Sequence, residues 1–140
     1  MNTKDGLRIV VVGANAAGLK AAARAKRLLP AASVTVVDRG QYISYGACGM
    51  PYVVSGDIES VDSLRETSYG AIRDPDFFRK AKGLEVLIQT EAQRIDREGR
   101  RVLCRSLVSG ETKAYPYDRL ILATGARPIV PKGIPANHPR

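Results

Sequence analysis

The chain has 140 residues, of which 44% are hydrophobic and 26% charged, a composition typical of one globular domain rather than of a disordered chain. No apolar run reaches the ~18 residues needed to span a bilayer, which argues against a membrane protein. The formal net charge of +8 would suit nucleic-acid binding, but the basic residues are scattered and accompany no zinc-ligand spacing, so we expect neither nucleic acid nor a metal site.

The first elements alternate between strand and helix. Leu7–Val12 is a continuous apolar run, typical of a strand buried on both faces. Ala16–Leu29 is rich in alanine, carries apolar residues at helical spacing and stops before Pro30, which predicts a helix. Val34–Val37 is a second β-branched run. Strand, helix and strand within ~30 residues predict a βαβ unit with parallel strands.

The later elements complete a three-layer, Rossmann-like α/β fold. Arg39–Gly56 is a loop rich in Gly, Tyr and Ser that runs into a short helix near Pro51, whereas Asp57–Tyr69 is polar and predicts no clear element. The remaining predicted elements are a helix at Pro75–Lys82, a third parallel strand at Glu85–Gln89, an antiparallel meander of Glu91–Asp96, Arg101–Leu107 and Thr112–Tyr115, and a last parallel strand at Leu120–Ala123. Four prolines in residues 127–140 predict an extended linker there, which leaves residues 1–126 as the folded part.

The turn between the first strand and the first helix carries a dinucleotide-binding pattern. It reads Gly13-Ala14-Asn15-Ala16-Ala17-Gly18, so the first and last glycines of the fingerprint are present and Asn15 stands at the middle one. The N–H groups and the positive end of the helix dipole still favour a phosphate there. Asp38 ends the second strand, where an acidic side chain reaches the ribose of an adenosine. The alternative is a plain helix cap.

A second motif surrounds one of the two cysteines. The loop reads Ser44-Tyr45-Gly46-Ala47-Cys48-Gly49-Met50-Pro51-Tyr52. A nucleophilic thiol must be a thiolate, which a helix N-terminus favours, and Pro51 suits the first turn of such a helix. The small neighbours of Cys48 would let a flat ring approach its sulfur. The alternative is a buried, inert cysteine, and this is what we expect of Cys104, which lies in an apolar strand pattern. With two cysteines, a reducing cytoplasm is the simpler location.

These motifs together resemble the single-cysteine branch of the pyridine nucleotide–disulfide oxidoreductases, which includes coenzyme A disulfide reductases, NADH oxidases, NADH peroxidases and polysulfide reductases. The resemblance extends over nearly the whole chain. It rests on the Cys48 loop and on three further stretches: Val11-Val12-Gly13 to Ala16-Ala17-Gly18, Thr90-Glu91-Ala92 to Ile95-Asp96, and Tyr117-Asp118-Arg119-Leu120 to Ala123-Thr124-Gly125-Ala126-Arg127-Pro128.

The resemblance implies that residues 1–126 are the first segment of an FAD-binding domain, followed by an NAD(P)H domain beyond residue 140, in a homodimer. It implies an enzyme that uses NADH or NADPH to reduce a disulfide, polysulfide, peroxide or oxygen through Cys48. Val53 stands where dithiol relatives carry a second cysteine, and Ala47 stands where coenzyme A disulfide reductases usually carry asparagine. The implied substrate contacts are Ser44, Arg24 and Arg27. The implied FAD contacts are Gly13, Ala14, Ala16, Ala17, Gly18, Asp38, Arg39, Ala92, Ala123, Thr124 and Gly125.

Two other classes of function remain open from the sequence. A nucleotide-binding module without redox catalysis would need Gly13, Gly18 and Asp38 but gives no reason for the loop around Cys48. A basic nucleic-acid-binding domain would show salt-dependent retention on DNA. The residues that select the electron acceptor and distinguish NADH from NADPH are expected beyond the end of this chain.

Overall fold

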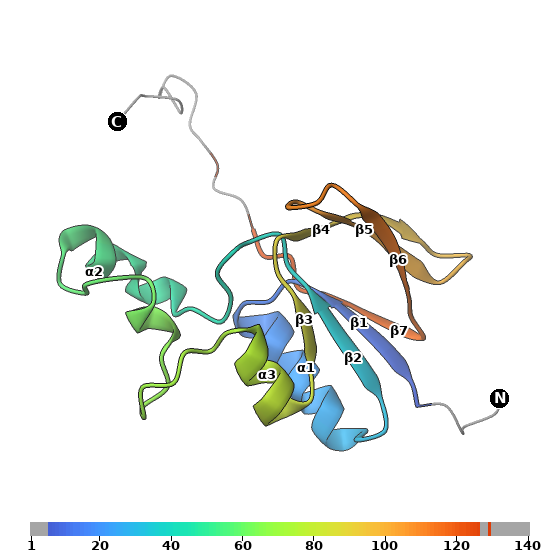
Figure 1. The fold of residues 1–140 in the computed structure, drawn as a ribbon, viewed down its shortest axis with the longest axis horizontal. Helices are drawn as coiled ribbons and strands as arrows, with labels where there is room; N and C mark the ends of the chain where they lie inside the picture. Colours follow the sequence, from blue (N-terminus) through green and yellow to red (C-terminus); the bar gives the residue numbers. More distant parts are fainter. Residues whose placement is uncertain (1–5, 127–128, 130–140) are drawn as a thin grey trace.

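A four-stranded parallel sheet forms the middle layer of the computed structural model, which describes residues 6–126 and 129 (Figure 1). In sheet order the strands are β3 (Glu85–Leu87), β2 (Ser33–Val37), β1 (Arg8–Val12) and β7 (Arg119–Leu122). Central β1 places Val10 opposite Thr35 of β2 and Leu120 of β7. The parallel pairing is confirmed, with β7 starting one residue earlier than predicted and β3 ending two residues sooner.

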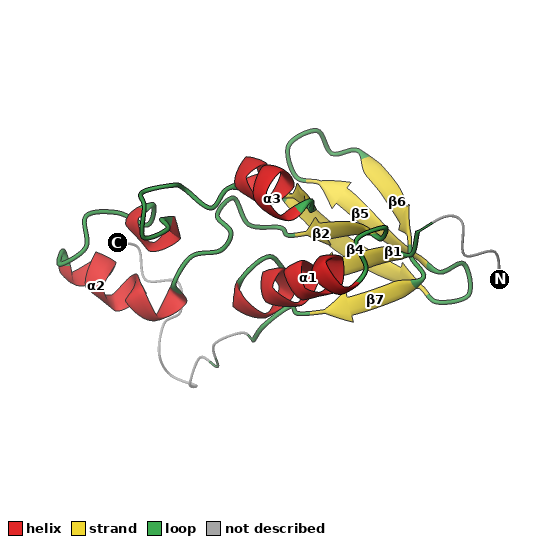
Figure 2. Ribbon diagram, turned by 90° about the horizontal axis from the view of Figure 1, so that it is seen from below, coloured by secondary structure: helices red, strands yellow, loops and turns green. Residues whose placement is uncertain are grey.

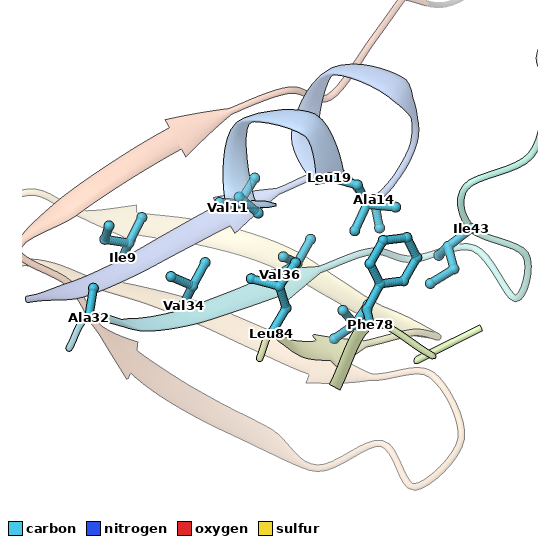
Figure 3. Close-up of a cluster of buried hydrophobic side chains, with 12 residues drawn as sticks. Ile9, Val11, Ala14, Leu19, Ala32, Val34, Val36, Ile43, Phe78 and Leu84 are labelled. Atoms are coloured by element: carbon cyan, nitrogen blue, oxygen red, sulfur yellow. The ribbon is translucent and has the colours of Figure 1, made fainter. Parts of the chain in front are cut away.

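Two helices, α1 (Ala16–Leu28) and α3 (Pro75–Lys82), cover one face of this sheet (Figure 2). The start of α3 is capped by Asp74, whose carboxylate accepts a 2.7 Å hydrogen bond from the Phe77 N–H, and Gly83 ends the helix with φ of 63°. Figure 3 shows the apolar cluster between the helices and the strands. It contains Ile9, Val11, Ala14, Leu19, Ala22, Ala32, Val34, Val36, Ile43, Phe78, Leu84 and Val86.

An antiparallel sheet covers the opposite face and forms the third layer. Its strands are β4 (Thr90–Asp96), β5 (Arg101–Ser106) and β6 (Thr112–Pro116). Val10 and Val37 of the parallel sheet pack there against Val102 and Cys104 of β5. Neighbouring residues of β1 and β2 thus contact opposite layers, which explains why Ile9–Val12 is a continuous apolar run and why β2 is buried from Val34 to Val37 although Thr35 is polar. The predicted three-layer fold is confirmed.

The chain crosses between the two sheets at Gln89. This residue has φ of 48°, a left-handed conformation that is uncommon outside glycine. Its N–H donates to the carbonyl of Gly40, and the N–H of Thr90 donates to the carbonyl of Asp38, at 3.0 and 2.9 Å. The predicted strand Glu85–Gln89 therefore ends early, and β4 starts beside the carboxyl end of β2.

After the buried Ile43, residues 45–73 extend away from the layers at one end of the molecule (Figure 1). This extension contains the 3₁₀ turn η1 (Ala47–Gly49), the short helix α2 (Met50–Ser55) and the 3₁₀ turn η2 (Ser63–Arg65). None of the six residues of α2 is buried. In residues 6–126 and 129, no helix has the length and apolar character to cross a membrane. The predicted linker at residues 127–140 lies outside the described residues, apart from Ile129.

Candidate functional site

The two glycines of the predicted nucleotide turn are required by close packing. Gly13 has φ of 111°, and a Cβ atom there would collide with the carbonyl oxygen of Ala123. A Cβ atom at Gly18 would collide with the carbonyl oxygen of Gly13 and lie 3.4 Å from the Ala123 Cβ. The turn therefore brings β1, the start of α1 and Ala123, which directly follows β7, into close contact.

The N-terminus of α1 is not closed by a side chain. Asn15 occupies the N-cap position with an extended backbone, but its side chain makes no capping hydrogen bond, and its Oδ1 atom is buried without a partner among the described residues. Ala16 and Ala17, in the first turn, are exposed. The alternative of a plain helix cap therefore lacks its defining bond. The first N–H groups of α1 are directed as in helix termini that bind phosphate.

Asp38 connects this turn to the loop after β2. Its Oδ2 atom accepts a 2.6 Å hydrogen bond from the N–H of Ala14, and its Oδ1 atom accepts a 2.7 Å bond from the N–H of Gly40. Ala14 is fully buried, so its N–H has no access to water as a substitute. Each carboxylate oxygen can accept a further hydrogen bond. The same side chain can thus hold the turn and receive a hydroxyl group.

A cleft of about 380 Å³ opens at the carboxyl ends of the parallel strands, where open α/β sheets bind their ligands. Six of the predicted contacts line it: Gly13, Asp38, Arg39, Ala92, Thr124 and Gly125. Five further lining residues were not among the predicted contacts, although all except Val37 stand in the stretches that carry the resemblance: Val12, Val37, Thr90, Glu91 and Ala126. Each of these five residues directly adjoins a predicted contact or a strand end. Thr90 and Glu91 belong to β4, which reaches this edge of the parallel sheet because the chain crosses over at Gln89.

The two cysteines occupy opposite environments. Cys48 is exposed in η1, immediately before α2, and Pro51 lies in the first turn of that helix as predicted. Cys104 is 1% exposed, and its burial raises the pKa of its thiol to about 11. Only Cys48 therefore offers an accessible thiol, and Cys104 is the structural residue that its apolar pattern predicted.

The loop of Cys48 is attached directly to the nucleotide turn. Ser44 donates its N–H to the carbonyl of Ala14 at 3.0 Å, and its φ of 55° turns the chain away from the buried anchor Ile43. The other predicted substrate residues, Arg24 and Arg27, lie exposed along α1. A backbone hydrogen bond thus joins the thiol loop to the nucleotide turn, whose Gly13 lines the cleft.

Residues 7–139 match the family of pyridine nucleotide-disulphide oxidoreductases. The chain belongs to this family. A curated relative in Pyrococcus horikoshii, an NAD(P)H coenzyme A polysulfide/persulfide reductase, is 35% identical over 124 residues, which are 89% of this chain and 25% of the relative. An NADH oxidase of Lactococcus lactis is 34% identical over 125 residues, 89% of this chain and 26% of its own length.

The solved structures agree with this family assignment. An NAD-dependent persulfide reductase from A. fulgidus superposes with a TM-score of 0.86 and 48% identity, covering 90% of this chain and 23% of that one. The chain thus spans about a quarter of the length of the family members that it matches.

Proposed function

We propose that this chain is the first FAD-binding segment of an NAD(P)H-dependent oxidoreductase that reduces a disulfide or polysulfide through Cys48. The observation that carries the proposal is the 3.0 Å bond from Ser44 to Ala14, which attaches the only exposed thiol of the described residues to the dinucleotide turn. A bare nucleotide-binding module would not need this connection. The persulfide and polysulfide reductases among the similar proteins support the same choice of substrate sulfur.

The residues of the cleft fit an FAD molecule. The free N–H groups at the start of α1 suit its pyrophosphate, and Asp38 retains acceptor positions for the adenosine ribose. The Gly13 turn lets the backbone approach closely, and Ala92, Thr124 and Gly125 line the same cleft. When bound, FAD would supply the two-electron chemistry that links NAD(P)H to the cysteine.

The chain itself supplies the nucleophile. The Cys48 thiolate would attack a sulfur–sulfur bond of the substrate, forming a mixed disulfide and releasing the other sulfur as a thiolate. Val53 cannot resolve this adduct, and Cys104 lies buried in the core between the two sheets. The described residues therefore contain no second thiol that could resolve the mixed disulfide on Cys48, which favours a mechanism with a single cysteine.

Oxygen is the alternative electron acceptor, because the chain is similar to an NADH oxidase. Peroxide would accept electrons from the same cysteine and flavin. Ser44, four residues before Cys48, is the proposed substrate contact in the loop, with Arg24 and Arg27, exposed on α1, as contacts for an anionic part of the substrate. We place these residues in a cytoplasmic homodimer that uses NADH or NADPH.

The test compares Cys48→Ser with Cys104→Ala in the FAD-loaded enzyme that contains this chain. We expect Cys48→Ser to retain flavin reduction by NAD(P)H but to lose turnover of disulfide and polysulfide, whereas Cys104→Ala should retain both because its thiol is buried. Full sulfur turnover by Cys48→Ser would refute the role of this cysteine. An enzyme that binds FAD but reduces none of disulfide, polysulfide, peroxide or oxygen would instead be a nucleotide-binding module.

A further inference from the structure

The loop of Cys48 rests on a segment for which the sequence predicted no structure. In the turn η2, the carbonyl of Leu64 accepts a 3.0 Å hydrogen bond from the N–H of Gly46. The Leu64 side chain fills the space beside Gly49, where a Cβ atom would meet its Cδ2 atom. Leu64 thus touches the loop on both sides of Cys48, two residues before it and one residue after it.

The neighbouring residue, Arg65, is the only buried charged residue among the described residues, at 8% exposed. Its Nη1 donates to the Asp62 carboxylate at 2.6 Å, and its guanidinium carbon lies 5.2 Å from the centre of the Tyr42 ring. Its Nε atom is buried and has no hydrogen-bond partner within residues 6–126 and 129. Arginine is rarely buried, because its charge loses hydration. Here the buried charge holds η2 against Tyr42, which directly precedes the core anchor Ile43.

A second arginine fixes the backbone of the first. The N–H and the Nε of Arg73 both donate to the carbonyl of Arg65, at 3.0 and 2.9 Å, and its Nη2 donates to the carbonyl of Glu66. Between them, Thr67 exchanges hydrogen bonds with Ala71. Residues 62–73 therefore form a small ordered unit, which we call the supporting segment.

We infer that Arg65 is a positioning residue that keeps Cys48 at its place in the redox loop. The loop needs such support because none of residues 44–49 is buried, and two of them, Gly46 and Gly49, have large conformational freedom. The supporting segment contacts Tyr42, just before the loop, and Gly46 and Gly49 within it. Arg65 makes the contact with Tyr42 through its guanidinium group. The inference rests on the proposed role of Cys48.

The experiment replaces Arg65 with methionine, which matches its length without its charge. Arg79→Met is the matched control, because Arg79 also pairs with an aspartate three residues earlier but lies exposed on α3, away from the loop. Hydrogen exchange at the Gly46 amide reports the bond to Leu64 without any flavin chemistry. We expect Arg65→Met to speed this exchange by about 10-fold or more and to lower kcat for sulfur turnover by on the order of 10–100-fold.

Flavin content and the KM for NAD(P)H should stay unchanged, and Arg65→Lys, which keeps a cation between Asp62 and Tyr42, should recover most of the loss. The inference would be overturned if the Gly46 amide exchanged at the same rate in Arg65→Met as in Arg79→Met. It would also be overturned if Arg65→Met lowered kcat while the exchange rate of this amide stayed unchanged. If Arg65→Met does not fold, Tyr42→Leu removes the ring from a 44% exposed position and must show the same two effects. Sulfur turnover by Cys48→Ser would refute the proposed function but not the contact between the supporting segment and the loop, because exchange of the Gly46 amide tests that contact independently.

Discussion

Replacing Asp38 with alanine would remove the carboxylate that holds the nucleotide turn to the loop after β2. Its two oxygens accept hydrogen bonds of 2.6 and 2.7 Å from Ala14 and Gly40, and both bonds are partly buried. A buried donor left unpaired costs about 1–3 kcal/mol. We therefore expect the free energy of unfolding to fall by about 2–4 kcal/mol, a large part of the ~5–15 kcal/mol that stabilises a typical domain.

Urea unfolding of the nucleotide-free chain measures this loss. Because the chain has no tryptophan, the transition is best followed by far-ultraviolet circular dichroism. Asp38→Asn keeps one acceptor oxygen and should lose about half as much as Asp38→Ala. Asp76→Ala is the matched control, because the Asp76 carboxylate forms an exposed ion pair with Arg79, and such pairs contribute about 0.2–1 kcal/mol.

The reasoning is wrong if Asp38→Ala is no less stable than Asp76→Ala. Flavin retention in the two Asp38 variants is a second measurement. Asp38→Ala would lose FAD both because the turn is loosened and because the ribose contact is removed. In Asp38→Asn the turn is less disturbed, so its loss of FAD reports mainly on the ribose contact. Flavin content that survives dialysis in both variants would contradict the proposed ribose contact.

Three further predictions follow from single contacts. Gly13→Ala should lower the thermal midpoint by about 10 °C or more, since it adds a collision to a φ of 111°, whereas Gly56→Ala, with φ of 89° and open space, carries only the backbone strain. The hydrogen bonds from Arg8 hold the pKa of Asp118 at about 2, below the ~4 of an unfolded aspartate. The ionised Asp118 therefore stabilises the fold above pH ~4, and this contribution is lost as the pH falls through about 2. In Asp118→Asn the free energy of unfolding should accordingly fall less steeply between these two pH values. Iodoacetamide at pH 8 should alkylate one thiol per native chain, and peptide mass spectrometry that finds Cys104 labelled would contradict its burial.

The layers of the fold could be predicted from the sequence because their signals are local. Two consecutive β-branched runs separated by an alanine-rich segment indicate parallel strands around a helix, and the structure confirms β1, α1 and β2 to within one residue at each end. The helix α3 has the predicted bounds, because Asp74 and Gly83 are cap residues that can be recognised without any tertiary contact. The glycines of the turn and the two cysteines were assigned on similar local grounds.

The connections between these elements were not predictable in this way. Gln89 adopts a left-handed backbone that its residue type does not favour, and it does so because hydrogen bonds to the loop after β2 compensate. Arg65 belongs to a polar stretch that suggested no element, and its burial depends on Tyr42 and Asp62 being brought to it. Such contacts join residues that share no periodic pattern.

Local patterns were enough to assign the strands of the parallel sheet, the position of the nucleotide turn and the cysteine that stands among small residues. The folded chain adds the hydrogen bond from Ala14 to Asp38, the bond from Ser44 to the nucleotide turn, and the contacts of Leu64 with the loop of Cys48. Strand and helix patterns can be recognised from the sequence because they depend on side chains a few positions apart. A hydrogen bond between distant backbone segments depends on the path of the whole chain.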